Sequence, residues 1–209
     1  MIDLNQNLGF VHSGPGIGDK VVYTSFAENY FSHTGRKLID IENHWAYDHN
    51  PYVLRGVVPD HVFDLWTMPL GTSAYPSLAQ RICESVGIPR TVLRHARLYA
   101  HEDEAIQRGR VVVHITGISA ASSAMPDHVI DHIAKVYSSF EIIQVGSTSD
   151  KATPFIDKRG LPLWESIHLL ATCEIFIGVD SGPMNIVNCY PKVRKKVVLL
   201  RELNGAVPV

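Results

Sequence analysis

Two glycine-rich turns in the sequence combine polar side chains with a flexible backbone. The first, GPGIGDK at residues 14–20, places Asp19 just after three glycines. Glycine lets a ligand approach the main chain closely, and a helix that begins there offers free N–H groups to an anion. Asp19 then has two interpretations, as an acid that stabilises the first helical turn or as a general base. The GxGxG spacing matches neither the dinucleotide GxGxxG nor the GxxxxGK[ST] phosphate loop.

The second turn, GVDSGPMN, spans residues 178–185. Asp180 or Ser181 is suited to cap a helix, and Pro183 is suited to its first turn, where a missing N–H costs nothing. The same turn could instead bind a diphosphate through its backbone amides. Two such turns, one in each half of the chain, favour a ligand held between the halves.

The elements that must position these turns alternate along the chain. Strands are predicted at residues 8–12, 37–41, 61–66, 110–115, 141–145, 174–177 and 196–200. Helical spacing follows the first turn up to Gly35 and recurs at residues 77–86, 130–137, 163–171 and after residue 181. Strands that alternate with helices predict an α/β protein with parallel sheets. A polar stretch over residues 94–110 divides it into two compact Rossmann-like lobes, residues 1–98 and 99–209.

Composition and charge restrict the class of protein. The 209 residues are 45% hydrophobic and 19% charged, with a net charge of −2 and no basic half, so a nucleic-acid partner is not favoured. Three widely spaced cysteines without a CxxC pair argue against disulfides and zinc knuckles. The chain shows neither a signal peptide nor an apolar run of the ~20 residues that a membrane span needs. We expect a cytoplasmic protein without stable membrane insertion.

The eleven histidines require a test for metal binding. His128 and His132 lie one helical turn apart, beside two aspartates, but HVIDH lacks the glutamate of an HExxH zinc site and the sequence names no third ligand. We therefore expect no metal site. His114, inside an apolar strand, is expected to be a hydrogen-bonded core residue. The aromatic segment over residues 43–56, which contains Tyr47 and His49, is suited either to stacking on a sugar or to packing against the first lobe.

Three segments carry a resemblance to a known family: residues 13–31, residues 110–137 and, most closely, LWESIHLLATCEIFIGVDSGPMNIV at residues 163–187. The two halves resemble the lobes of the glycosyltransferase-B fold (GT-B), and in particular the heptosyltransferase-type glycosyltransferases of family 9. The resemblance implies a ligand cleft between the lobes. It also implies transfer of a sugar from a nucleotide diphosphate donor to a hydroxyl acceptor, such as a glycan, with inversion and without a required metal or cofactor.

The resemblance also implies roles for single residues. Asp19 would be the catalytic base. The second lobe would bind the donor through a set of small, polar and turn residues: Thr116, Gly117, Ser147, Asp180, Ser181, Gly182, Pro183 and Met184. The acceptor side, in the first lobe, would include Gly16, Gly18, Tyr47 and His49.

Two alternatives to a glycosyltransferase remain open. A nucleotide-dependent epimerase or oxidoreductase would use the first glycine turn, with Asp40 near the end of the next strand as its ribose contact. A non-catalytic relative that binds a glycan or a partner is favoured by two departures from the family pattern. Asn185 replaces the usual histidine, and the loop over residues 116–127 lacks the usual lysine, for which Lys151, Lys158 or Arg159 could substitute.

Overall fold

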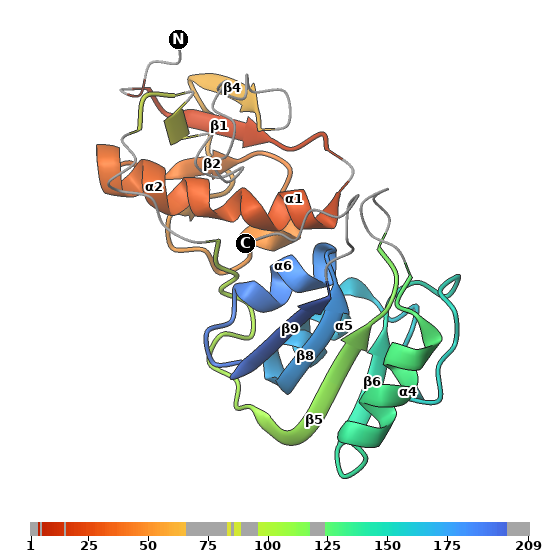
Figure 1. Cartoon of the computed structure of the whole chain (residues 1–209). Helices are drawn as coiled ribbons and strands as arrows, with labels where there is room; N and C mark the ends of the chain where they lie inside the picture. Colours follow the sequence, from red (N-terminus) through yellow and green to blue (C-terminus); the bar gives the residue numbers. More distant parts are fainter. Residues whose placement is uncertain are drawn as a thin grey trace. The chain divides into compact units, whose positions relative to one another are not determined.

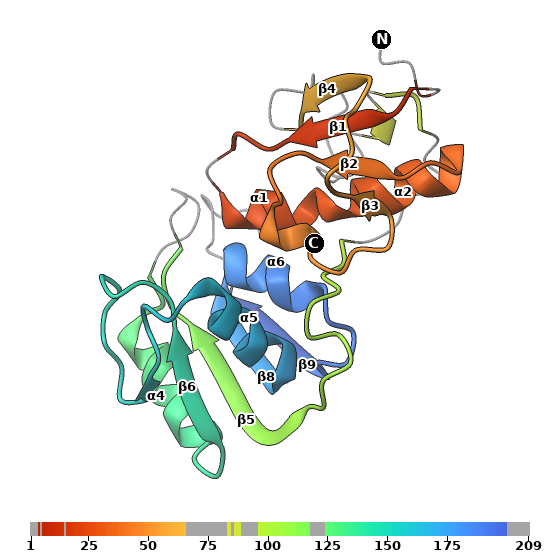
Figure 2. The same ribbon diagram turned by 180° about the vertical axis from the view of Figure 1, so that it is seen from behind.

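The computed structural model describes residues 4, 6–14, 16–65, 83–84, 86–88, 96–117 and 124–199, the last five without their side chains. The chain divides into two compact units, Met1–Ala100 and His101–Val209. Each unit is described by itself (Figures 1 and 2).

The first unit is built on a parallel sheet of four strands in the order β3-β2-β1-β4. Its elements in chain order are β1 (Leu8–Val11), α1 (Ile17–Val22), α2 (Thr24–Thr34), β2 (Leu38–Asp40), the short 3-10 helix η1 (Trp45–Tyr47), β3 (Val53–Leu54) and β4 (His61–Asp64). Figure 1 shows α1 and α2 running one after the other along the sheet. Because α1 is the next element after β1 in the chain, it begins near the carboxyl end of β1, where the first glycine turn lies.

The core of the first unit lies between α2 and the sheet. Phe26 and Tyr30, one turn apart on α2, are fully buried, and the Phe26 ring meets the Phe63 ring of β4 edge-on at 5.8 Å. Helix α2 ends at Gly35, which has φ +71° and donates its N–H to the Phe31 carbonyl at 2.8 Å. Such a left-handed C-terminal residue is the conformation that glycine adopts at least cost.

The second unit has a parallel sheet of five strands in the order β7-β6-β5-β8-β9. Its elements are β5 (Gln107–His114), α4 (Asp127–Val136), β6 (Glu141–Val145), β7 (Ile156–Asp157), α5 (Leu163–Thr172), β8 (Cys173–Val179), α6 (Gly182–Asn188) and β9 (Lys195–Leu199). In both views α4 covers one face of this sheet, and α5 and α6 cover the other.

Successive side chains of β5 point to opposite faces of the second sheet, so this strand contributes to the core on both faces. Val111 and Val113 form one buried cluster with Ile130 and Ile133 of α4. The residues between them point to the opposite face, so His114 lies on the side of α5 and α6. A strand covered on both faces reads as the continuous apolar run seen in the sequence.

The prediction of two α/β lobes with parallel sheets is confirmed. All seven predicted strands form, while the very short β3, β7 and η1 were not predicted. The helix predicted at residues 77–86 falls largely outside the described residues. Cys83, Cys173 and Cys189 are buried, and none of the three is in a disulfide. Among the described residues, no helix combines the length and hydropathy of a membrane span.

Candidate functional site

The carboxyl edge of the first sheet gathers polar groups from three strands. All its strands are parallel, so their carboxyl ends meet at one edge. Directly after β1, the His12 N–H donates to Glu42 Oε2 at 3.0 Å. The Ser13 N–H and hydroxyl donate to the two Asp64 carboxylate oxygens at 3.2 and 2.5 Å. Carboxylates from both neighbouring strands therefore fix the start of the first glycine turn.

Asp19 lies at this edge, in the first turn of α1. Its carboxylate lies close to Gly16: a Cβ atom built on Gly16 would lie 2.6 Å from Asp19 Oδ2. Burial lowers the pKa of the nearby His12, and the negative charges of Asp64 and Asp19 partly offset that lowering. Asp19 is half-buried, so a ligand can reach it.

A buried ion pair supports the segment after β2. The Asp40 side chain is fully buried, accepts the backbone N–H groups of Glu42 and His44, and contacts Arg55 Nη2 at 3.0 Å. Arg55 also donates to Asp48 and to the His44 carbonyl, each at 2.8 Å. The structure therefore uses Asp40, the ribose contact of the oxidoreductase alternative, to hold the loop that leads into η1.

The predicted acceptor residues lie in different environments. Tyr47 is 3% exposed, its ring packs against Phe10 at 4.6 Å, and its hydroxyl has no hydrogen-bond partner among the described residues. His49 is exposed and has φ +60°, while Gly16 and Gly18 are half-buried. The Tyr47 ring thus belongs to the packing of the first unit. A contact of any of the four with an acceptor stays a prediction.

The carboxyl edge of the second sheet brings the predicted donor residues together. His114, at the end of β5, pairs with Val145 of β6 and with Gly178 of β8, so the three strands end at nearly the same level. The loops that follow them contain the eight predicted residues: Thr116 and Gly117, then Ser147, then Asp180, Ser181, Gly182, Pro183 and Met184. All of them are half-buried or exposed. Their contact with a donor stays a prediction.

A hydrogen-bond chain joins the second glycine turn to the end of β5. The Ser181 hydroxyl donates to the Val179 carbonyl at 2.9 Å and lies 3.0 Å from His114 Nδ1. A hydroxyl has one proton, so this network assigns the imidazole proton to Nδ1. Burial lowers the pKa of His114 and favours its neutral form, although Asp150 opposes the shift. As predicted, His114 is a hydrogen-bonded core histidine, but its partner in the second glycine turn was not foreseen.

Because the Ser181 side chain bonds to His114, it makes no cap hydrogen bond to α6. The first amides of a helix have no acceptor within the helix, and in α6 these are the N–H groups of Gly182 and Met184, since Pro183 has none. After β6, Gly146 has φ +140°, and a Cβ atom there would collide with the Asp150 carboxylate, which accepts the Ser147 N–H at 2.9 Å. The sequence analysis missed Asp150, although a glycine directly after a predicted strand marks such a tight turn.

Two of the cations considered as replacements for the family lysine are held by acids. Lys151 Nζ lies 2.5 Å from Asp127, and Arg159 Nη2 lies 2.7 Å from Asp157. Neither requires a bound diphosphate to balance its charge.

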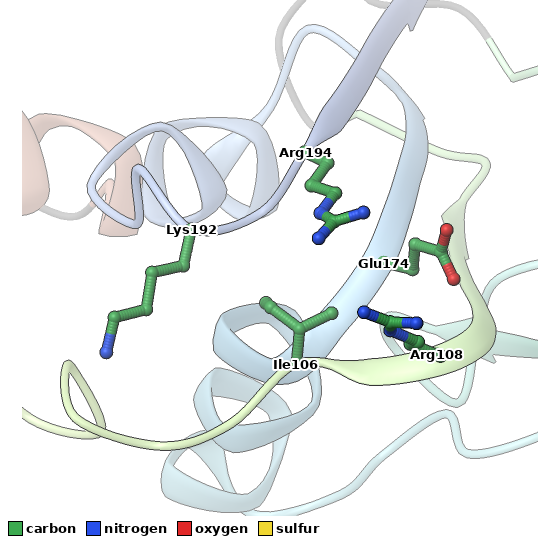
Figure 3. A pocket seen from close by; sticks show the side chains of 5 residues that line it. All are labelled: Ile106, Arg108, Glu174, Lys192 and Arg194. Atoms are coloured by element: carbon green, nitrogen blue, oxygen red, sulfur yellow. The ribbon is translucent and has the colours of Figure 1, made fainter.

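A hollow of about 420 Å³ lies at the other edge of the second sheet, lined by Ile106, Arg108, Glu174, Lys192 and Arg194 (Figure 3). The Glu174 carboxylate accepts the Gly109 N–H of β5 at 2.7 Å, while Lys192 points away from the other lining residues and donates to the Glu102 carbonyl at 2.8 Å. The hollow lies where β5 and β8 begin. It is therefore separate from the edge that carries the predicted donor residues.

No family model and no curated protein matches the chain. A family 9 glycosyltransferase from Veillonella parvula has a TM-score of 0.67 at 13% identity, covering 92% of this chain and 85% of its own. Escherichia coli ADP-heptose lipopolysaccharide heptosyltransferase II has a TM-score of 0.67 at 13% identity, covering 95% and 91%. This chain has the fold of the family 9 glycosyltransferases. The dodecameric iron-containing heptosyltransferase TibC of enterotoxigenic E. coli, in complex with ADP-D-β-D-heptose, is also similar, with a TM-score of 0.69 at 16% identity, covering 93% and 58%.

Proposed function

We propose that the chain transfers a sugar from a nucleotide diphosphate donor to the hydroxyl group of an acceptor such as a glycan. The observation that carries this proposal is the likeness of more than nine-tenths of the chain to glycosyltransferases, one of them bound to a nucleotide sugar. In the proposed enzyme the second unit binds the donor and the first unit binds the acceptor. The nucleotide sugar is a substrate, and no separate cofactor takes part.

The chemistry of the second unit suits a diphosphate leaving group. Negative charge grows on the diphosphate as its bond to the anomeric carbon breaks, and backbone amides stabilise such charge without having to reorganise. The first amides of α6 are not capped by Ser181, and the residues of the Thr116–Gly117 and Gly146–Ser147 turns are half-buried or exposed. His114 holds Ser181 in place and is the positioning residue of this edge.

The first unit supplies a base in Asp19. The acceptor oxygen forms a bond to the anomeric carbon while the bond from that carbon to the diphosphate oxygen breaks, and the acceptor proton passes to the Asp19 carboxylate. Attack from the side opposite the leaving group inverts the configuration at the anomeric carbon. The proposed reaction needs no metal, because amides balance the leaving group and a carboxylate takes the proton.

Replacing Asp19 with Asn tests this assignment, because Asn keeps the shape of the side chain and removes its basicity. Transfer should fall about 10²- to 10⁴-fold, the usual contribution of a general base. Donor affinity should change less than about twofold, since Asp19 lies in the other unit. Asp131→Asn, on the exposed face of α4, is the matched control. Wild-type transfer by Asp19→Asn would remove the proposed base, and absence of nucleotide-sugar binding to the wild-type chain would contradict the transferase itself.

A further inference from the structure

His101, Glu104 and His168 form a cluster in the second unit, here called the His–Glu–His cluster. One nitrogen or oxygen atom of each lies within 4.8 Å of the others. Glu104 Oε1 contacts His101 Nδ1, and Glu104 Oε2 lies 2.8 Å from His168 Nδ1. The two imidazole rings meet edge-on at 5.3 Å between centroids. Two imidazole nitrogens and a carboxylate thus converge on one point.

The backbone holds these residues in place from two elements that are distant in sequence. His101 has φ +61°, a left-handed conformation that is uncommon outside glycine, and its carbonyl accepts the Glu104 N–H at 3.2 Å. This tight turn places both side chains on one side of the chain. His168 comes from the second half of α5, where its carbonyl accepts the Thr172 hydroxyl at 2.8 Å.

We propose that the His–Glu–His cluster binds a divalent transition-metal ion, of which Zn²⁺ fits best. Zinc takes imidazole nitrogen and carboxylate oxygen at about 2.1 Å, and two histidines with one glutamate are an established ligand set for it. Tetrahedral bonds of that length put donor atoms about 3.4 Å apart, a spacing that small side-chain rotations in this cluster provide. The nitrogen donors exclude Mg²⁺ and Ca²⁺, which prefer oxygen ligands.

The exposure of the cluster suits such an ion. The side chains of His101, Glu104 and His168 are 25%, 38% and 43% exposed, so a water molecule has access as the fourth ligand. A divalent ion binds the neutral form of an imidazole through one ring nitrogen, and the other ring nitrogen then carries the proton.

The position of the cluster assigns the ion a structural role. His101 and Glu104 precede the start of β5, whereas the predicted donor loops follow the end of that strand. The eight residues of β5 separate the two sites by about 26 Å. A bound ion would tie the beginning of the second unit to α5 and stabilise its fold. The proposal is independent of the proposed transferase, which needs no metal.

The sequence analysis excluded a metal site because no third ligand could be named for His128 and His132. Among the described residues, the group of candidate ligands is the His–Glu–His cluster, which unites Glu104 with His168, 64 positions later. The exposed pair on α4 is therefore the natural control, because two histidines one turn apart would account for weak, unspecific metal binding.

The test uses the full chain, stripped with a chelator and titrated with Zn²⁺ by calorimetry. We expect one ion per chain, with micromolar or tighter affinity, and a melting temperature that rises with Zn²⁺ concentration. Glu104→Gln and His168→Ala should each weaken binding at least about tenfold. His128→Ala combined with His132→Ala should leave the affinity unchanged. Circular dichroism confirms that each variant is folded, and having two cluster variants protects the test if one fails to fold.

Co²⁺ provides a second readout, because its visible absorption reports the coordination geometry. We expect a four-coordinate spectrum in the wild-type chain and in the His128/His132 control, and its loss in the cluster variants. Absence of saturable binding of one Zn²⁺ or Co²⁺ ion per wild-type chain would overturn the proposal. So would binding that survives both cluster substitutions and disappears in the control.

Discussion

Substitution of Gly16 by Ala should move the Asp19 carboxylate while leaving its chemical group unchanged. Gly16 has φ −81° and ψ 126°, which Ala adopts without strain. The added Cβ atom would lie 2.6 Å from Asp19 Oδ2, whereas ordinary contact begins at 3.4 Å, so the carboxylate must move by about 0.8 Å. A displacement near 1 Å in a catalytic group can cost about 100-fold in rate, so we expect a 10- to 100-fold loss of transfer. This corresponds to about 1.4 to 2.7 kcal/mol of barrier.

The stability of the Gly16→Ala variant should move the other way. Ala restricts the unfolded chain and adds about 0.4 to 1 kcal/mol of stability where the native backbone accepts it. Urea unfolding would show this gain, while release of nucleoside diphosphate from a sugar donor would report transfer. The same change in an Asp19→Asn background should have no further effect on rate, since it acts only through the carboxylate. Wild-type transfer by Gly16→Ala, or an undiminished loss in the double variant, would refute the proposed geometry.

Four further substitutions test the supporting contacts. Burial lowers the pKa of His44 from 6.5 to about 4, so below pH 6.5 the unfolded chain gains a proton that the folded chain does not bind. When urea unfolding is compared at pH 7 and pH 4.5, this half-exposed ring should lower the free energy of unfolding of the wild-type chain by about 1 to 2 kcal/mol at the lower pH. His44→Asn should remove that part of the pH dependence. Arg55→Ala leaves the buried Asp40 carboxylate without its cation and should cost about 2 to 3 kcal/mol in urea unfolding. Arg110→Ala breaks a surface ion pair with Glu141 and should lower the free energy of unfolding by less than about 1 kcal/mol. Equal losses in Arg55→Ala and Arg110→Ala would contradict the idea that burial of Asp40 makes its ion pair the more important one. Ser181→Ala removes the hydrogen-bond partner of the buried His114 imidazole, so we expect the free energy of unfolding to fall by about 1 to 2 kcal/mol. We also expect weaker binding of nucleoside diphosphate. Unchanged binding by calorimetry would contradict a role of Ser181 in the nucleotide site.

Local sequence patterns predicted the framework of the molecule because they follow from local physics. The β-branched run after residue 110 forms a strand that is buried on both faces, and Gly35 ends α2 in a left-handed conformation that few other residues adopt. The positions of Asp19 and Ser181 at helix starts were predicted in the same way, from turns that lie between a strand and a helix.

Contacts between distant residues could not be predicted from such patterns. Ser181 and His114 are 67 positions apart, and only the pairing of β5 with β8 makes them neighbours. The same holds for His168 and Glu104, which the packing of α5 brings together. Tyr47 shows that the surroundings of a side chain also depend on such contacts. From the sequence its aromatic ring was suited to stacking on a sugar, but in the structure the ring packs against Phe10.

Nucleotide binding tests the proposed function most directly. A thermal-shift panel would compare ADP, UDP, GDP, CMP and their sugar conjugates with NAD, at concentrations that reach about 100 times a typical dissociation constant. Binding at that level stabilises the folded chain by about 2.7 kcal/mol, which a melting curve resolves. We expect selective stabilisation by one nucleoside diphosphate and its sugar conjugate, weakened in Ser181→Ala. Stabilisation by NAD alone, or no shift with any nucleotide, would contradict a nucleotide-sugar site in the second unit.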